Sequence, residues 1–373
     1  MIRRAVLAAV VGLSAVFAFG AGALPHDPDR WARYDSEHFT IFSNADAERA
    51  ETLARDLEML RAAIGRVTGL QPASPVPTHV FLFADGSSMR AYKHLWQGEP
   101  ASLSGAYYGG AHADFLTINA RQPREARWTL FHEYVHTVLR NNFPGLPLWL
   151  DEGLAELFAS FVVQDGVGVL GRAMPRHLNP LGRQEPISLE ELLAVDQTSP
   201  RYNAFEHQGE FYTQSWALVH YLWVGDGGER RRQALDFVGR TFAGDSIEEA
   251  FVAAFGGGFD VLERELRAYR ASGFAARRIP LGDLPQAAVA RHALAEPELL
   301  VALGELLAAQ GDTRRDDALW HFERALELNP KSARALVGLG LVAQQRGDWS
   351  RARALYSQAL DRRDEALAHY LYG

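Results

Sequence analysis

The chain has 373 residues, a net charge of −8 at pH 7 and no cysteine. A chain of this length can form two domains, each with its own hydrophobic core. The acidic balance argues against nucleic acid as a partner, because proteins that bind it present a basic face. The lack of cysteine excludes disulfides and thiolate metal ligands, so histidine and carboxylate side chains would have to hold any metal ion.

The first 23 residues have the pattern of a secretory signal peptide. Arg3 and Arg4 precede an apolar run over residues 5–19, and small residues at 21–23 suit cleavage before Leu24. The run is short for a membrane span, and an uncleaved membrane anchor is the alternative. No later stretch is long and apolar enough to cross a bilayer. We therefore expect an exported protein with no stable membrane span after cleavage, which in a Gram-negative bacterium would be periplasmic.

Hydrophobic periodicity predicts an α+β domain over residues 24–280, with a small N-terminal sheet and a helical second half. A stretch rich in Gly and Pro, residues 166–201, is expected to be loop with one short helix near 189–195. The predicted strands are 39–42, 79–83 and 115–119. The predicted helices are 46–67, 123–142, 148–163, 211–223, 231–241, 246–255 and 259–272.

The C-terminal region, residues 281–373, carries an internal repeat. Its two copies are 36 residues apart, and it resembles the tetratricopeptide repeat family, whose period is 34. A turn at residues 312–315 would hold the two extra residues. The resemblance implies an all-α array of helical hairpins that binds a protein partner and leans on the preceding domain or is cut off here. The matching positions are Gly304, Gly311, Ala318, Phe322 and Ala325 in the first copy and Gly340, Gly347, Ala352, Tyr356 and Ala359 in the second.

One predicted helix carries the pattern His132-Glu133-x-x-His136. Residues four apart share a helix face, so both imidazoles can reach one metal ion, with Glu133 beside it as a general base for water. The alternative is a pair of histidines satisfied by hydrogen bonds alone. The apolar flanks of this helix predict burial, and burying two imidazoles and a carboxylate without partners would be costly. The pattern therefore favours a metal site.

A second string, Trp149-Leu150-Asp151-Glu152-Gly153-Leu154-Ala155, follows at short range. Together the two strings resemble the gluzincin metallopeptidases, and most closely the peptidase MA-like domains that are often joined to tetratricopeptide repeats. The resemblance implies a zinc ion held by His132, His136 and Glu152. It also implies that Glu156, one turn further on, hydrogen-bonds a ligand imidazole. Asp151 stands where this clan often has Asn.

The same resemblance implies a tyrosine or histidine that stabilises the oxyanion, and an edge strand that pairs with an extended peptide. Tyr212 is the candidate for the first role, with a packing aromatic as the alternative, and residues 115–119 for the second. His207 and His220 are weaker candidates, and we expect His220 to lie in the core.

The residues at particular positions of the chain argue against two related classes of zinc peptidase. A metzincin would need Gly at 139 and His at 142, where this chain has Leu139 and Asn142. The aminopeptidase branch of the gluzincins uses an acidic anchor before the zinc helix, and residues 109–119 contain no Glu. The expected enzyme is therefore an endopeptidase.

The expected function is an exported zinc-dependent peptidase with a peptide or protein substrate. In it, Glu133 takes a proton from the attacking water and passes it to the leaving amine. The alternative is a catalytically idle zincin-like scaffold whose tetratricopeptide repeats act as a protein-interaction module. The intact Glu133 counts against the alternative, because an idle scaffold does not need a general base.

Overall fold

A computed structural model of the chain describes residues 25, 27–70, 72, 74–101, 105–110, 112–121, 123–143, 145–181, 186–203, 205–280, 288–362 and 366–372. The signal peptide predicted at residues 1–23 lies outside this range, as does the predicted domain boundary at residue 281. The side chain of His207 is likewise outside the description. None of the helices in the described part combines the length and apolar character that a membrane span needs.

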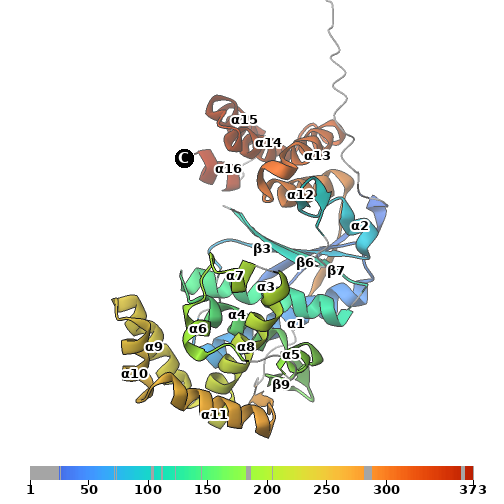
Figure 1. Ribbon diagram of the computed structural model, residues 1–373. Coiled ribbons are helices and arrows are strands. Elements are labelled where there is room, and N and C mark those ends of the chain that lie inside the picture. The colour runs from blue at the N-terminus through green and yellow to red at the C-terminus, as the bar shows by residue number, and fades with distance from the viewer. Residues whose placement is uncertain are drawn as a thin grey trace, which may run out of the picture.

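A mixed sheet of six strands forms the centre of the described structure, in the order β11–β1–β2–β3–β7–β6 (Figure 1). Strands β2, β3 and β7 are parallel to one another, whereas β1, β6 and β11 run antiparallel to their neighbours. The three predicted strands correspond to β2, β3 and β7 and are confirmed. The strands are β1 (Ala32–Asp35), β2 (Phe39–Ser43), β3 (Thr78–Phe83), β6 (Gly105–Gly109), β7 (Asp114–Asn119) and β11 (Ala290–Ala293).

The edge strands of this sheet are β11 and β6, and the predicted segment 115–119 is not one of them. Strand β7 lies between β3 and β6, so both of its edges are already hydrogen-bonded. The expectation that residues 115–119 accept a peptide along a free edge is therefore wrong. Residues 105–109 fold back antiparallel on β7 and carry the edge instead. The sequence does not predict this strand, because both ends of the segment have weak strand propensity. The segment is Gly105-Ala106-Tyr107-Tyr108-Gly109.

The helices follow the predicted order (Figure 1), and most begin and end within a few residues of the expected positions. They are α1 (Ala47–Thr68), α2 (Gly86–Arg90), α3 (Pro123–Asn142), α4 (Leu148–Ala159), α5 (Pro175–Leu181), α6 (Leu189–Ala194), α7 (Pro200–Asn203), α8 (Phe205–Trp223), α9 (Arg231–Ala243), α10 (Ile247–Phe255), α11 (Phe259–Ser272), α12 (Glu296–Ala308), α13 (Arg315–Leu328), α14 (Ala333–Gln345), α15 (Trp349–Arg362) and α16 (Ala366–Tyr372).

Three stretches differ from the prediction, and the first is α8, which begins at Phe205 rather than at residue 211. Helix α4 ends at Ala159 rather than at residue 163, because β8 (Val162–Gln164) turns at Asp165 and Gly166, both with positive φ, and pairs with β9 (Val167–Leu170). The stretch 166–201, expected to be mainly loop, contains β9 and the short helices α5, α6 and α7. Strand β10 (Arg277–Pro280) completes this small sheet, and β4 (Leu95–Trp96) pairs with β5 (Glu99–Pro100) elsewhere.

The two faces of the large sheet are covered by different helices. Val80 and Leu82 of β3 belong to a core shared with α1, α3, α4 and α8. Phe81 and Phe83 of the same strand belong to a second core shared with α2, α12 and α13. Alternate strand residues point to opposite faces, so the continuous apolar run of β3 reflects burial on both sides. Figure 1 shows α12 and α13 across the sheet from α1 and α3.

The C-terminal helices form two antiparallel hairpins, and α16 packs against the second of them. A Cβ atom on Gly304 would lie 2.7 Å from the ring of Phe322, and one on Gly340 would lie 2.3 Å from the ring of Tyr356. Only glycine therefore lets the two helices of each hairpin approach. A 3-10 turn at Gly311–Arg314 precedes α13, whereas α15 starts two residues after Gly347. This turn holds the two residues by which the first copy is longer.

The helical array is joined to the sheet rather than set apart from it. Strand β11 lies after residue 280 and pairs with β1, so the sheet takes strands from both sides of the predicted boundary. Gln310 donates a hydrogen bond to the backbone carbonyl of Tyr92, 2.9 Å away, and His321 of α13 faces the Tyr92 hydroxyl. The first hairpin thus leans on the preceding domain, as expected.

The buried His321 should make the protein less stable in acid. Burial lowers its pKa to about 4, with the nearby Arg314 adding to this and a hydrogen bond to the Asp317 carbonyl opposing it. The unfolded-state pKa is about 6.5, so the stabilisation is complete above that pH and is lost as the pH falls towards 4. Between pH 7.5 and pH 5 we expect this residue to cost about 2 kcal/mol of unfolding free energy.

Urea unfolding of the chain and of His321→Gln at the two pH values measures this cost. The variant should show a pH dependence smaller by that amount. Equal pH dependence in both proteins would contradict the assignment.

Candidate metal centre

Three side chains from two adjacent helices converge below the sheet. His132 and His136 lie on α3, and Glu152 lies on α4, which packs against it. The Nε2 atoms of the two histidines are 3.0 Å apart. Glu152 Oε2 lies 3.4 Å from Nε2 of His132 and 3.3 Å from Nε2 of His136. The structure therefore brings together the three residues that the sequence predicts as metal ligands.

The close approach of α4 to α8 depends on Gly153, which follows Glu152. A Cβ atom at this position would lie 2.4 Å from Cγ2 of Val219 and 2.7 Å from the backbone carbonyl oxygen of Ser215. Because Glu152 precedes this contact, the glycine sets how deeply its carboxylate is placed, and only 3% of Glu152 is exposed. The Glu-Gly pair of the sequence thus combines a ligand with the residue that allows its helix to pack.

The donor triangle suits a tetrahedral metal ion. Zinc bonds of about 2.0–2.2 Å place neighbouring ligand atoms about 3.4 Å apart, close to the three distances found here. Glu152 Oε2 is buried and has no hydrogen-bond partner among the described residues, although it points at both imidazoles. Two histidines and one carboxylate also form a known zinc ligand set that leaves a fourth position open. The residues present therefore fit a zinc ion.

The ionisable side chains of the site shift one another's pKa values. Burial by itself would lower the pKa of His136, but Asp151 and Glu152 more than offset this and raise it to about 10. Burial would raise the pKa of Glu152, yet the adjacent imidazoles of His132 and His136 bring it down to about 2. The carboxylate is thus held ionised over the whole neutral range, which is the form that binds a cation.

Both histidines have a carboxylate beside the second ring nitrogen. Asp151 Oδ1 lies 3.1 Å from Nδ1 of His136, within hydrogen-bond distance. Glu156 Oε1 lies 3.7 Å from Nδ1 of His132, while the other oxygen of Glu156 accepts a hydrogen bond of 2.8 Å from His177. Glu156 therefore lies where the sequence predicts it, but its short hydrogen bond goes elsewhere. Asp151, noted in the sequence only as a departure, is the carboxylate hydrogen-bonded to an imidazole of the triangle, that of His136.

Glu133 lies on the same helix as both histidines and is half-buried. Its charge reaches Tyr108 of β6, whose pKa is raised chiefly by burial, with Glu133 adding to this. Helix α3, which carries Glu133, packs against β6.

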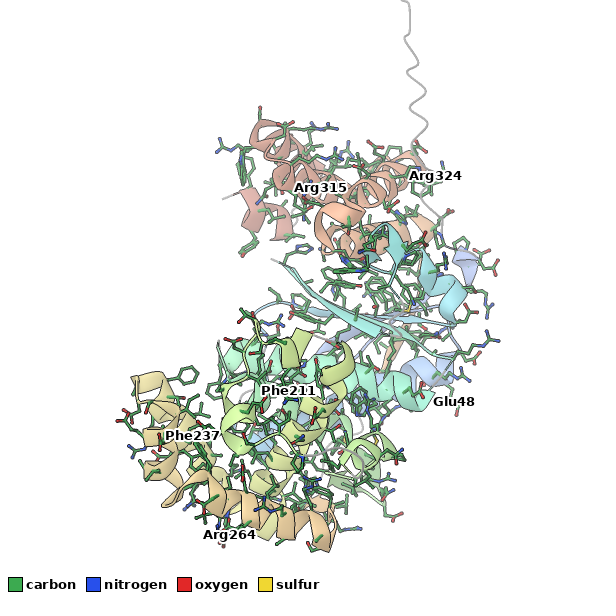
Figure 2. The ribbon with its side chains drawn as sticks, viewed as in Figure 1. Glu48, Phe211, Phe237, Arg264, Arg315 and Arg324 are labelled. Atoms are coloured by element: carbon green, nitrogen blue, oxygen red, sulfur yellow. The ribbon has the colours of Figure 1, made fainter. Side chains whose placement is uncertain are left out.

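Two phenols lie next to Glu152, although the sequence singled out only one. The ring of Tyr212 on α8 is 6.3 Å from the ring of His132. Tyr202 on α7 donates a hydrogen bond of 3.2 Å to Glu152 Oε1. Burial, with the nearby Glu152, raises the pKa of Tyr202 to about 12 and that of Tyr212 further. Both are therefore protonated donors at neutral pH. Phe211, labelled in Figure 2, packs against both rings.

Sequence reasoning missed Tyr202 and His177. His177 lies in the stretch 166–201 and Tyr202 lies directly after it, and no periodicity marks the short helices α5 and α7 that carry them. His220, a weaker candidate, is fully buried and lies within 2.7 Å of the Gly171 carbonyl oxygen, so it is a core residue as expected.

Residues 309–373 match the tetratricopeptide repeat family. This match begins directly after α12 and covers all of α13 to α16, so the C-terminal helical region is a tetratricopeptide repeat on an α+β chain. Such repeats are modules for binding other proteins. A comparison with curated protein sequences gave no match.

Proposed function

We propose that this protein is a zinc-dependent peptidase of the gluzincin type. The observation that carries the proposal is the triangle of His132, His136 and Glu152, with Glu133 one residue from the first ligand on the same helix. Zinc sites of two histidines and one glutamate with a free fourth position are typical of hydrolases that act on peptide bonds.

The roles of the side chains follow from their chemistry. A zinc ion bound here would act as a Lewis acid on the substrate carbonyl and would acidify the attacking water. Glu133 accepts the proton of that water and delivers it to the leaving amine. Tyr212 donates to the carbonyl oxygen as negative charge develops on it, while Tyr202 holds the Glu152 carboxylate through its hydrogen bond to Oε1. Within the described part of the chain no strand pairs with the outer edge of β6, so this edge can take an extended peptide, which favours cleavage within a chain.

The tetratricopeptide repeats support a second component of the function. They present a protein-binding module fixed to the sheet opposite the metal centre. We propose that they recruit a substrate or a protein partner to an exported enzyme, in line with the signal pattern of residues 1–23. An idle scaffold that binds partners through the same repeats is the competing proposal, and it predicts no hydrolysis.

Metal analysis of the mature protein and of two alanine variants tests this proposal. We expect about one zinc ion per chain in the native protein and none in Glu152→Ala, because two histidines alone hold zinc weakly. Glu156→Ala should still bind zinc, because Glu156 lies beside the ligand His132 and is not itself a ligand. Its zinc affinity should be reduced about 10–100-fold. Mass spectrometry after reloading with zinc gives the metal content. An absence of zinc from the native protein would refute the peptidase proposal.

A further inference from the structure

We propose that His177 is a positioning residue for the ligand His132 and that it acts through Glu156. The proposal rests on the zinc site proposed above. His177 lies on α5, in the stretch where the sequence predicts mostly loop, and is only 2% exposed. Its ring stacks on Trp216 of α8, with ring centres 4.1 Å apart and planes 17° apart. A histidine held this firmly presents its Nε2 atom in one fixed direction.

The fixed position of the His177 ring orients the carboxylate of Glu156 through a hydrogen bond. The Nε2–H group of His177 donates to Glu156 Oε2 over 2.8 Å. This bond occupies one oxygen of Glu156, and the other oxygen, Oε1, lies 3.7 Å from Nδ1 of His132. Glu156 is itself 3% exposed, so water has little access to complete its hydrogen bonds. His177 therefore decides which oxygen of Glu156 faces the ligand.

His132 needs that oxygen for a specific reason. A histidine that ligates a metal through Nε2 must be neutral and must carry its proton on Nδ1. Nδ1 of His132 is buried and has no hydrogen-bond partner among the described residues. Oε1 of Glu156, 3.7 Å away, is the oxygen that faces this nitrogen. Glu156 then fixes both the tautomer and the ring orientation of His132.

Helix α5 also contacts the other side of this ligand. Arg176, next to His177, places its guanidinium 3.4 Å from the ring centre of Trp128. Trp128 lies one turn before His132 on α3, with ring centres 5.1 Å apart. The stretch 166–201, expected to be mainly loop, therefore contains a helix with contacts to His132 through two neighbours, Glu156 and Trp128. This arrangement supports a positioning role rather than simple packing.

Zinc affinity in three single variants tests the proposal. His177→Phe retains a ring on Trp216 but removes the donor, and should weaken zinc binding about 10–100-fold. His177→Gln places an amide N–H close to the lost Nε2–H group and should restore most of the affinity. Leu178→Ala, on the same helix and 45% exposed, is the matched control and should bind zinc normally. Competition with a chromophoric chelator gives the dissociation constants.

A double-mutant cycle separates positioning from loss of folding. The Glu156→Gln variant has no carboxylate at this position, so adding His177→Phe to it leaves no buried charge without a donor. We therefore expect the double variant to fold. Its zinc affinity should be no weaker than that of Glu156→Gln alone. Thermal unfolding of the metal-free proteins checks the fold. Unchanged affinity in His177→Phe, or additive losses in the cycle, would overturn the positioning role while the zinc site stands. A native protein without zinc overturns both proposals.

Discussion

Replacing Glu133 with glutamine is expected to reduce peptide hydrolysis by about 10³-fold or more while leaving the zinc content unchanged. General-base catalysis contributes about 10²–10⁴-fold, and glutamine has the shape of glutamate but cannot accept the proton. Glu133 lies outside the group of three residues placed to hold the metal, so its loss leaves the ligand triangle intact. The variant should therefore lose peptide hydrolysis while it retains zinc.

The measurement is turnover of a fluorescently labelled unfolded protein, with zinc determined on the same samples. Glu125→Gln is the matched control, because Glu125 is an exposed residue in the first turn of the same helix. It should behave as the native protein does. Turnover in Glu133→Gln equal to that of the control would rule out Glu133 as the base. Absence of turnover in all three zinc-loaded proteins would favour the idle scaffold.

Replacing Gly153 with alanine is expected to lower the unfolding free energy by about 3 kcal/mol, because overpacking a tight helix contact costs about 1–3 kcal/mol. The added methyl group would overlap the side chain of Val219 and the carbonyl oxygen of Ser215, and a backbone atom cannot move aside cheaply. Moving α4 away from α8 also displaces Glu152 from the two histidines. Zinc affinity should fall together with stability.

Urea unfolding of the metal-free proteins gives the first quantity, and chelator competition gives the second. Gly209→Ala is the matched control, since Gly209 lies in α8 with no atom within 4 Å of its would-be Cβ. This control should be as stable as the native protein or more stable by about 1 kcal/mol, the helix propensity of alanine over glycine. Native stability in Gly153→Ala would show that the helices can separate without cost.

Local patterns in the sequence determined much of the architecture around the site. The alternation and runs of apolar residues predicted β2, β3, β7 and the long helices α1 and α3, because burial on one or two faces leaves a direct mark on the residue order. The four-residue spacing of His132 and His136 predicted their shared face for the same reason. The glycine and aromatic positions of the C-terminal repeat predicted the hairpins, since close helix contacts require small residues at fixed intervals.

Only the tertiary structure decided which residues from distant segments complete the site. Tyr202 and His177 lie on helices of four and seven residues, too short to carry a periodic signal, and they reach Glu152 and Glu156 only because α5 and α7 pack on α8. The edge position of β6 and the docking of α12 on the sheet likewise depend on long-range pairing. Such contacts join residues that are far apart in the chain. A local sequence pattern predicts that a residue is buried or requires a polar partner, but it does not identify that partner.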